Sequence, residues 1–357
     1  MANALKLCCD VVRWFPVVFI TAIVLWSYYA YVVQLCAFTV PSIAEKVVYL
    51  ILYHPLLVLF MWSYGRTIMA APGKVPRQFY LNKQDSDRLT RETNEEVQKA
   101  ILMTAAKDLP IVNRTSSGLP RYCEKCKCIK PDRCHHCSVC GLCVLKMDHH
   151  CPWVNNCVGF TNYKFFVQFL GYALIYCLYV AATSVKYFIS FWSGHGNRDM
   201  GKFHVLFLFF VSIMFGISLI SLFGYHCYLT ASNRSTLEAF RSPIFQSGPD
   251  KNGFSMGKYG NFVEVFGESK KEWFLPIFST QRDGVSFPTR TKQANTYQTM
   301  GKTPSVGDGV NYPTRTVDLD SDGLLAERQR WMEEGGELGT VNSYGAHDNN
   351  GMNLELR

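Results

Sequence analysis

Four apolar stretches constrain the fold of this 357-residue chain more than any other feature. They run approximately over residues 14–39, 47–69, 165–191 and 203–229. A helix needs ~20 apolar residues to cross a bilayer, and inside lipid only helices and closed barrels satisfy their own backbone. The four stretches together predict an α-helical integral membrane protein with four transmembrane helices. The first is too long for the apolar part of a signal peptide and lacks a small-residue cleavage site, so we expect it to be retained.

Lysine and arginine residues in the connections predict the orientation of these spans. The loop from 66 to 164 carries sixteen of them, whereas the connection before the second span has only Lys46 and the one before the fourth has Arg198 and Lys202. We therefore expect both termini and the central loop to be cytosolic. The formal net charge of +8 suits a protein that faces anionic cytoplasmic lipid. It does not predict binding to nucleic acid, because no groove-reading motif gathers the basic residues.

A metal-ligand pattern, C-x2-C-x9-H-x6-C, occurs twice in the central loop, offset by fourteen residues. Three thiolates and one imidazole at these spacings are typical of a closed tetrahedral zinc site. We expect two structural Zn²⁺ ions and, from about 121 to 160, short hairpins whose fold comes from metal rather than from a hydrophobic core. The two interleaved ligand sets are Cys123, Cys126, His136 and Cys143, and Cys137, Cys140, His150 and Cys157.

The distribution of cysteine agrees with metal binding. Nine of the fourteen cysteines lie between Cys123 and Cys157, and in reducing cytosol such a cluster indicates a metal site rather than a disulfide framework. One of the nine, Cys151, is a further fourteen residues beyond Cys137. Val154 stands where the next thiol of a third site would be needed, so no third site can close.

Cys151 is therefore a spare thiol on a metal scaffold, and His149 is a spare imidazole two residues before it. Asp148 can orient His149, which can in turn accept the thiol proton. We predict Cys151 as a nucleophile, with His149 and Asp148 as its catalytic partners. The alternative is that Asp148 and His149 only hydrogen-bond to zinc ligands.

The predicted zinc sites would not themselves favour a thiolate at Cys151. Zinc with three thiolates and one imidazole has a net charge of −1, and a closed site leaves no position for an activated water. Activation must then come from His149 or from nearby cations such as Lys130, Arg133 or Lys146.

The motif Asp148-His149-His150-Cys151, in a cysteine-rich region between the second and third of four spans, resembles the DHHC family of protein S-acyltransferases (palmitoyltransferases). The likeness covers roughly residues 10–285 and is greatest to the DHHC20- and DHHC15-like members. It implies a two-step reaction. Cys151 first takes a long acyl group from palmitoyl-CoA or another long-chain acyl-CoA as a thioester. It then passes that group to a cysteine of a membrane-associated protein, at the surface of the lipid bilayer.

The resemblance also assigns residues outside the cysteine-rich region. The family's T-T-x-E motif appears as Ser235-Thr236-Leu237-Glu238, in which serine keeps the hydroxyl of the first threonine. A C-terminal motif places Asn261 as a structural anchor. Residues assigned to the acyl-chain cavity are Ser27, Tyr176 and Trp153, the first two at its closed end. The acyl-CoA substrate that the resemblance implies needs cations for its phosphates, and our candidates are Lys130 and Arg133. For Ser27 and Tyr176 the alternative is ordinary packing between helices.

Two other classes of protein remain open on the sequence alone. A zinc-containing adaptor or ubiquitin-ligase-like scaffold would need no spare nucleophile. A transporter or channel would more often place ionisable residues deep in its spans, where His54 and Lys186 are the few that we identify. The spare Asp148, His149 and Cys151 favour the acyltransferase.

The remaining expectations concern the flanking segments and location. An amphipathic helix is expected within 86–109. Cys8 and Cys9 are possible acylation sites, and Asp320, Leu324 and Leu325 match an acidic dileucine sorting signal. We expect the protein in the Golgi, with the plasma membrane or endosome as alternatives. The expected divisions are 1–70 (first two spans), 71–120 (linker), 121–162 (zinc region), 163–230 (last two spans), 231–285 (C-terminal domain) and 286–357 (disordered tail).

Overall fold

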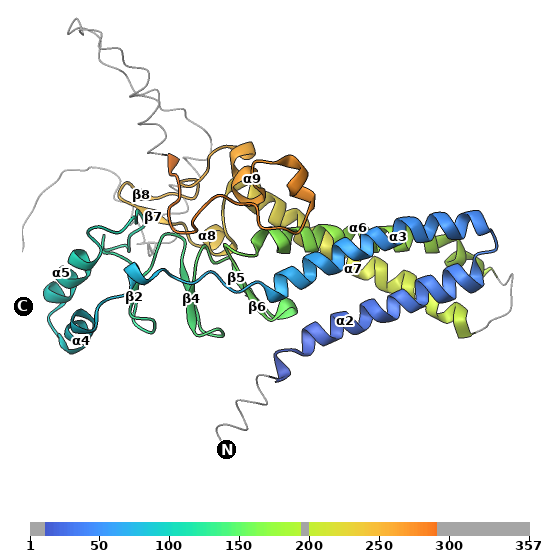
Figure 1. Cartoon of the computed structure of the whole chain (residues 1–357), viewed down its shortest axis with the longest axis horizontal. Coiled ribbons are helices and arrows are strands. Elements are labelled where there is room, and N and C mark those ends of the chain that lie inside the picture. The colour runs from blue at the N-terminus through green and yellow to red at the C-terminus, as the bar shows by residue number, and fades with distance from the viewer. Residues whose placement is uncertain (1–10, 194–199, 291–357) are drawn as a thin grey trace, which may run out of the picture. The chain divides into compact units, whose positions relative to one another are not determined.

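The computed structural model describes residues 11–193 and 200–290 (Figure 1). Within them, four helical segments are long and apolar enough to cross a membrane, which confirms the main prediction. The first span is α2 (Phe15–Tyr28) continued by the π-helix η1 (Tyr29–Thr39). The others are α3 (Ile43–Met69), α6 (Tyr163–Trp192) and α7 (Met200–Ser232). Each span lies within a few residues of its expected bounds.

The helix α6 is the central span. In its most apolar window 61% of residues are buried, against 28% for the span in α7, because α6 packs on both α3 and α7. The neighbouring α3 begins where the Ser42 side chain caps it by accepting the N–H of Glu45. It ends at Met69, three residues before Pro72.

The linker between the second and third spans contains two short helices instead of the single helix expected within 86–109. They are α4 (Lys83–Arg91) and α5 (Glu95–Ala105). The chain breaks between them because the Glu92 carboxylate accepts the N–H groups of Thr93 and Asn94. The Asn94 side chain then caps α5 by accepting the N–H of Glu96 at 2.9 Å. Local hydrogen bonding of this kind competes with a continuous helix.

The cysteine-rich region forms three antiparallel hairpins, as expected. They pair β1 (Tyr122–Cys123) with β2 (Cys128–Ile129), β3 (His135–Cys137) with β4 (Leu142–Val144), and β5 (His149–Cys151) with β6 (Asn156–Val158). A single turn of 3-10 helix, η3 (Pro152–Val154), follows β5. His136 faces Cys143 in the second hairpin, and His150 faces Cys157 in the third. The fourteen-residue sequence offset is therefore also a structural repeat.

This region also has an apolar core, contrary to the expectation that its fold comes from metal rather than from a hydrophobic core. Val144 and Ile129 are fully buried, and Phe79 from the linker and Val285 from the C-terminal segment are buried as well. Phe79, Ile129 and Val285 belong to one hydrophobic cluster with Cys123. Phe79 and Val285 come from segments distant in sequence, so residues 121–160 alone could not reveal how this core is completed.

The segment after α7 packs back on the zinc region and on α6. It contains α8 (Thr236–Phe240), β7 (Ile244–Phe245), β8 (Gly248–Pro249), α9 (Lys258–Phe266) and η4 (Lys270–Phe274). Gln168 of α6 donates to the carbonyls of Trp273 and Leu275, both at 2.9 Å. Phe287 is buried, so the packed segment extends past the expected boundary at 285. Cys8, Cys9, Asp320, Leu324 and Leu325 lie outside the described residues.

Candidate active site

Both predicted metal-ligand sets converge in the structure, and each could hold a metal ion. In the first set, His136 Nδ1 lies 3.6, 3.2 and 3.9 Å from the sulfurs of Cys123, Cys126 and Cys143. A tetrahedral zinc ion with Zn–S of ~2.3 Å and Zn–N of ~2.0 Å separates such donors by ~3.5 Å. The donor set therefore fits zinc.

The second set repeats this geometry. His150 Nδ1 lies 3.7, 3.4 and 3.6 Å from the sulfurs of Cys137, Cys140 and Cys157. Because β5 carries both His150 and the neighbouring Cys151, a metal held here would also fix the strand that presents the spare thiol. Cys151 belongs to neither set.

Asp148 and His149 form a close pair beside Cys151. Nδ1 of His149 lies 2.6 Å from Oδ2 of Asp148, and the Asp148 side chain is 2% exposed. Burial lowers the pKa of His149, but the Asp148 carboxylate and Cys151 outweigh burial and raise it to about 9. Burial would raise the pKa of Asp148, yet its contacts with His149 keep it below the usual value. The arrangement suits an imidazolium that stabilises a neighbouring thiolate.

The Ser-Thr-x-Glu motif holds Asp148 from the other side. Thr236 donates its backbone N–H to Oδ1 and its hydroxyl to Oδ2 of Asp148, both at 2.8 Å. Ser235 caps α8, and the Glu238 carboxylate accepts the N–H of Ser235 in return. This reciprocal capping fixes the helix start that presents Thr236. Ser235 therefore serves at the first position of the motif, because its hydroxyl accepts the N–H of Glu238.

The structure corrects the expected role of Arg133, which is 1% exposed. Its guanidinium donates twice to Glu238, at 2.8 and 2.7 Å, and to the side chain and carbonyl of Asn233. Lys146 lies 2.7 Å from Glu264. Neither cation is available to bind a coenzyme phosphate or to activate Cys151 directly, because both are committed to buried carboxylates. Lys130 is half-buried on the zinc region.

The residues assigned to the acyl cavity have distinct environments. Ser27 Oγ lies 2.8 Å from Tyr176 Oη, and both side chains are buried between α2 and α6. Trp153 is 51% exposed, so its side chain is available to contact a chain leaving Cys151. Its carbonyl accepts the hydroxyl of Tyr64 at 2.9 Å. Asn261 donates to the Ala231 carbonyl at 2.7 Å and so ties α9 to the end of α7.

Sequence reasoning missed His226. It lies on α7, is 2% exposed, and its ring contacts that of His149 at a centroid separation of 5.9 Å. The Tyr163 hydroxyl lies 3.2 Å from its Nδ1. The signal was an ionisable residue inside an apolar span, but only His54 and Lys186 were identified on that basis. Those two bond elsewhere, His54 to the Leu50 carbonyl and Lys186 to Glu45.

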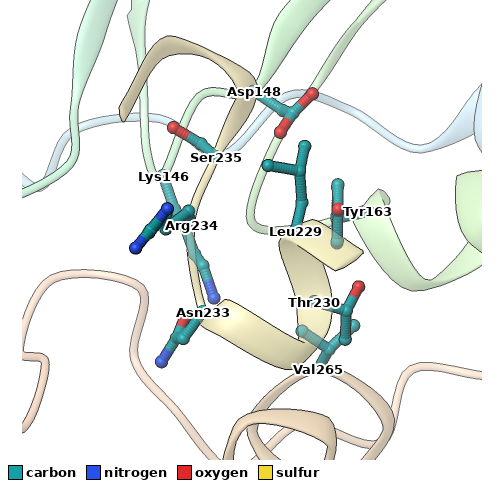
Figure 2. Close-up of a pocket in the computed structure, with 9 residues that line it drawn as sticks. All are labelled: Lys146, Asp148, Tyr163, Leu229, Thr230, Asn233, Arg234, Ser235 and Val265. Atoms are coloured by element: carbon teal, nitrogen blue, oxygen red, sulfur yellow. The ribbon is translucent and has the colours of Figure 1, made fainter. Parts of the chain in front are cut away.

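A small pocket borders Asp148 at the C-terminal end of α7. Figure 2 shows its lining, which includes Lys146 and Asp148 of the zinc region, Tyr163 of α6, and Leu229 and Thr230 of α7. Its volume is about 10 Å³, which is room for about one water molecule. It is therefore part of the support behind Asp148 and not a site for an acyl chain.

Comparison with known proteins adds a family. Residues 116–243 match the family model described as DHHC palmitoyltransferase. Palmitoyltransferase ZDHHC2 of Danio rerio is 56% identical over 302 residues, which cover 84% of each chain. Palmitoyltransferase ZDHHC15 of Mus musculus is 55% identical over 291 residues, covering 82% of this chain and 86% of that one. Palmitoyltransferase ZDHHC20-A of Danio rerio is 54% identical over 289 residues, covering 81% of each.

Proposed function

This chain belongs to the DHHC palmitoyltransferase family, and we propose that Cys151 is the residue that carries the acyl group in its protein S-acyltransferase reaction. The observation that supports this role is the Asp148–His149 pair, hydrogen-bonded at 2.6 Å beside a thiol outside both ligand sets. A scaffold or a transporter would need neither the pair nor the spare thiol.

In the first step the proton of the Cys151 thiol passes to His149, and the Cys151 sulfur attacks the thioester carbonyl of a long-chain acyl-CoA. The bond between that carbonyl and the coenzyme sulfur breaks, and the coenzyme thiolate takes the proton from His149. Asp148 stabilises the imidazolium between these transfers. The products are acylated Cys151 and free coenzyme A.

In the second step a cysteine of a membrane-associated protein takes the place of the coenzyme. His149 accepts its proton, its sulfur attacks the Cys151 thioester, and the Cys151 thiol is restored with that proton. No oxidant or reductant is consumed. Zn²⁺ in both ligand sets would hold the hairpins in place and would take no part in either acyl-transfer step.

The spans offer a path for the acyl chain. One hydrophobic cluster joins Cys151 to Phe166, Phe169 and Tyr176. Burying a chain among these side chains is worth ~0.8 kcal/mol per methylene, which the cytosolic domain could not supply. Palmitoyl-CoA is the donor that we propose, with its phosphates on the cytosolic side near Lys130.

The same reaction supports the orientation of the protein. Acyl-CoA and reduced thiols belong to the cytosol, so we place the zinc region and both termini there, in agreement with the lysine and arginine bias. We propose that the protein resides in the Golgi, with the plasma membrane or endosome as the alternatives. Imaging of the tagged chain against organelle markers tests this, and exclusive residence in another membrane would refute it.

The central experiment compares Cys151→Ser with wild type. After incubation with an alkyne-bearing palmitoyl-CoA analogue, wild type should carry a hydroxylamine-sensitive label and Cys151→Ser none. Both should retain about two zinc ions per chain. Cys227→Ser, which removes a half-buried thiol outside both sets, is the control and should label like wild type. Full labelling of Cys151→Ser would assign the acyl group to another residue.

A further inference from the structure

Three buried hydroxyl groups join α2, α6 and α3 within the membrane-spanning region. Ser27 Oγ and Tyr53 Oη each lie 2.8 Å from Tyr176 Oη. Ser27 is 4%, Tyr176 6% and Tyr53 0% exposed. Only the first two were assigned to the cavity on the sequence, and Tyr53 had no role.

The direction of the hydrogen bonds follows from counting protons. Each hydroxyl has one proton to donate. Ser27 donates its proton to the Val24 carbonyl at 2.8 Å, so it accepts from Tyr176. Tyr176 has then used its own proton and accepts from Tyr53. Tyr53 is thus the donor at the start of a chain of hydroxyls that ends on the backbone of α2.

A second contact fixes the ring of Tyr53. It stacks on Tyr31 with centroids 4.4 Å apart and an interplanar angle of 7°. The Tyr31 hydroxyl does not join the chain of hydroxyls, because it donates to Thr183 at 2.9 Å. Tyr31 therefore supports the ring of Tyr53 and leaves its hydroxyl to Tyr176.

The three hydroxyls stand at the far end of the apolar path from Cys151. Phe166 contacts the His149 ring at a centroid separation of 5.2 Å. Tyr176 follows Phe166 by ten residues on α6, which corresponds to ~15 Å of helix. An acyl chain that passed this level would separate the hydroxyls and leave buried polar groups unpaired, which is unfavourable.

We propose that Tyr53 is a specificity-determining residue for acyl-chain length. With Ser27 and Tyr176 its hydroxyl forms a three-helix barrier, and the protein accepts saturated long-chain acyl groups that end before this barrier. The inference rests on the proposed reaction at Cys151. It adds α3 to a barrier for which the sequence indicated only α2 and α6.

The test is a competition among acyl donors. Purified full-length protein in detergent is incubated with an equimolar series of saturated acyl-CoAs from myristoyl to arachidoyl, and the Cys151 adducts are resolved by mass spectrometry. Tyr53→Phe removes the hydroxyl and keeps the stacked ring. We expect the ratio of stearoyl to palmitoyl adduct to rise roughly threefold to tenfold, the effect of one lost hydrogen bond.

Tyr31→Phe is the matched control, because it removes the other hydroxyl of the same stacked pair. It should leave the ratio within about twofold of wild type, because the Tyr31 hydroxyl donates to Thr183 and not to Tyr176. Tyr53→Leu, which also removes the ring, should shift the ratio further than Tyr53→Phe.

The outcomes separate this inference from the proposed function. Normal total adduct with an unchanged ratio in both Tyr53 variants would overturn the role of Tyr53 and leave Cys151 as the acyl carrier. An equal shift in Tyr31→Phe would also overturn it, since the effect would then be general loosening. Absence of any adduct on Cys151 in wild type would instead refute the proposed function.

Discussion

The hairpins β3–β4 and β5–β6 share one backbone pattern but differ in chemistry. After a shift of fourteen residues their registers are identical, with His136 opposite Cys143 in one and His150 opposite Cys157 in the other. Cys137 and Cys151 are equivalent positions in this repeat. Cys137 belongs to one of the two sets that could hold a metal ion, whereas Cys151 in β5–β6 belongs to neither.

The two histidines that precede the ligand histidines show what makes the difference. Burial lowers the pKa of His135 to about 4, and Arg121 acts in the same direction. Burial acts likewise on His149, but Asp148 outweighs it and the pKa rises to about 9. The residue before His135 is Cys134, at the start of β3–β4, and the residue before His149 is Asp148, at the start of β5–β6. One carboxylate thus makes a buried imidazole basic enough to take the proton of a thiol.

The largest expected effect is on folding, at the equivalent cysteines. Cys137→Ala removes a ligand from an interleaved site, and structural zinc contributes an apparent ~10–16 kcal/mol to such domains. We expect loss of zinc from both sites and proteolysis of the zinc region, while Cys151→Ser retains both ions. Zinc per chain by atomic emission and limited proteolysis are the measurements.

Cys128→Ala is the matched control for this comparison. Cys128 is also buried in the zinc region but lies outside both ligand sets, so its loss should cost about 1 kcal/mol without loss of metal. Equal zinc loss in Cys128→Ala and Cys137→Ala would contradict the assignment of ligands.

The next effect is on rate, at the equivalent histidines. His149→Gln removes the proton acceptor, so autoacylation should fall by ~10²–10⁴-fold. His135→Gln changes the corresponding residue of β3–β4 and should alter the rate by less than about threefold in the fraction that folds. Single-turnover labelling with palmitoyl-CoA measures both. Similar losses in the two variants would show that the hairpins do not differ as proposed.

A smaller effect is expected at Thr236, which donates two hydrogen bonds to the Asp148 carboxylate. Thr236→Val keeps the shape and the backbone N–H bond to Asp148 but removes the hydroxyl bond. Loss of one bond to a charged group, about 1.5–3 kcal/mol, should slow acylation by roughly tenfold or more. Thr236→Ser should restore most of the rate, and failure of this rescue would argue that packing, not the hydroxyl, is responsible.

No glycosylation is expected at the two N-x-[ST] sequons, which begin at Asn113 and Asn233. Asn113 and Asn233 are 3% and 4% exposed, and Asn233 accepts a hydrogen bond from Arg133. The cytosolic orientation that we propose would also keep both asparagines from the glycosylating enzyme. Endoglycosidase should leave the mobility of the protein unchanged. A shift abolished by Asn113→Gln would place the hairpins on the wrong side of the membrane for acyl-CoA.

Spacing alone was sufficient to predict both metal-ligand sets, because ligands fixed by one pattern must meet wherever the pattern repeats. The Asp148–His149 pair could also be predicted, since adjacent residues need no tertiary information. Arg133 could not be assigned correctly in this way. Its partner Glu238 is 105 residues away, and the charge of a residue does not reveal whether it will be buried.

Other features were not predicted for other physical reasons. The break between α4 and α5 depends on side-chain hydrogen bonds around Asn94 that compete with an otherwise continuous pattern. His226 and Tyr53 lie in spans whose overall apolar character hid their polar atoms. The ring centroid of the buried Phe287 lies 5.2 Å from the guanidinium carbon of Arg133. The local composition does not predict this contact.

The ion pairs around Arg133 also have a consequence for the order of events during synthesis. The hairpins leave the ribosome first, and Glu238 and Glu264 follow 105 and 131 residues after Arg133. Thr236, which donates hydrogen bonds to Asp148, follows Asp148 by 88 residues. Until the fourth span has been inserted, a nascent chain would bear its nucleophile without the groups that orient it. Assembly of the reaction centre is thereby delayed until the enzyme has reached its membrane.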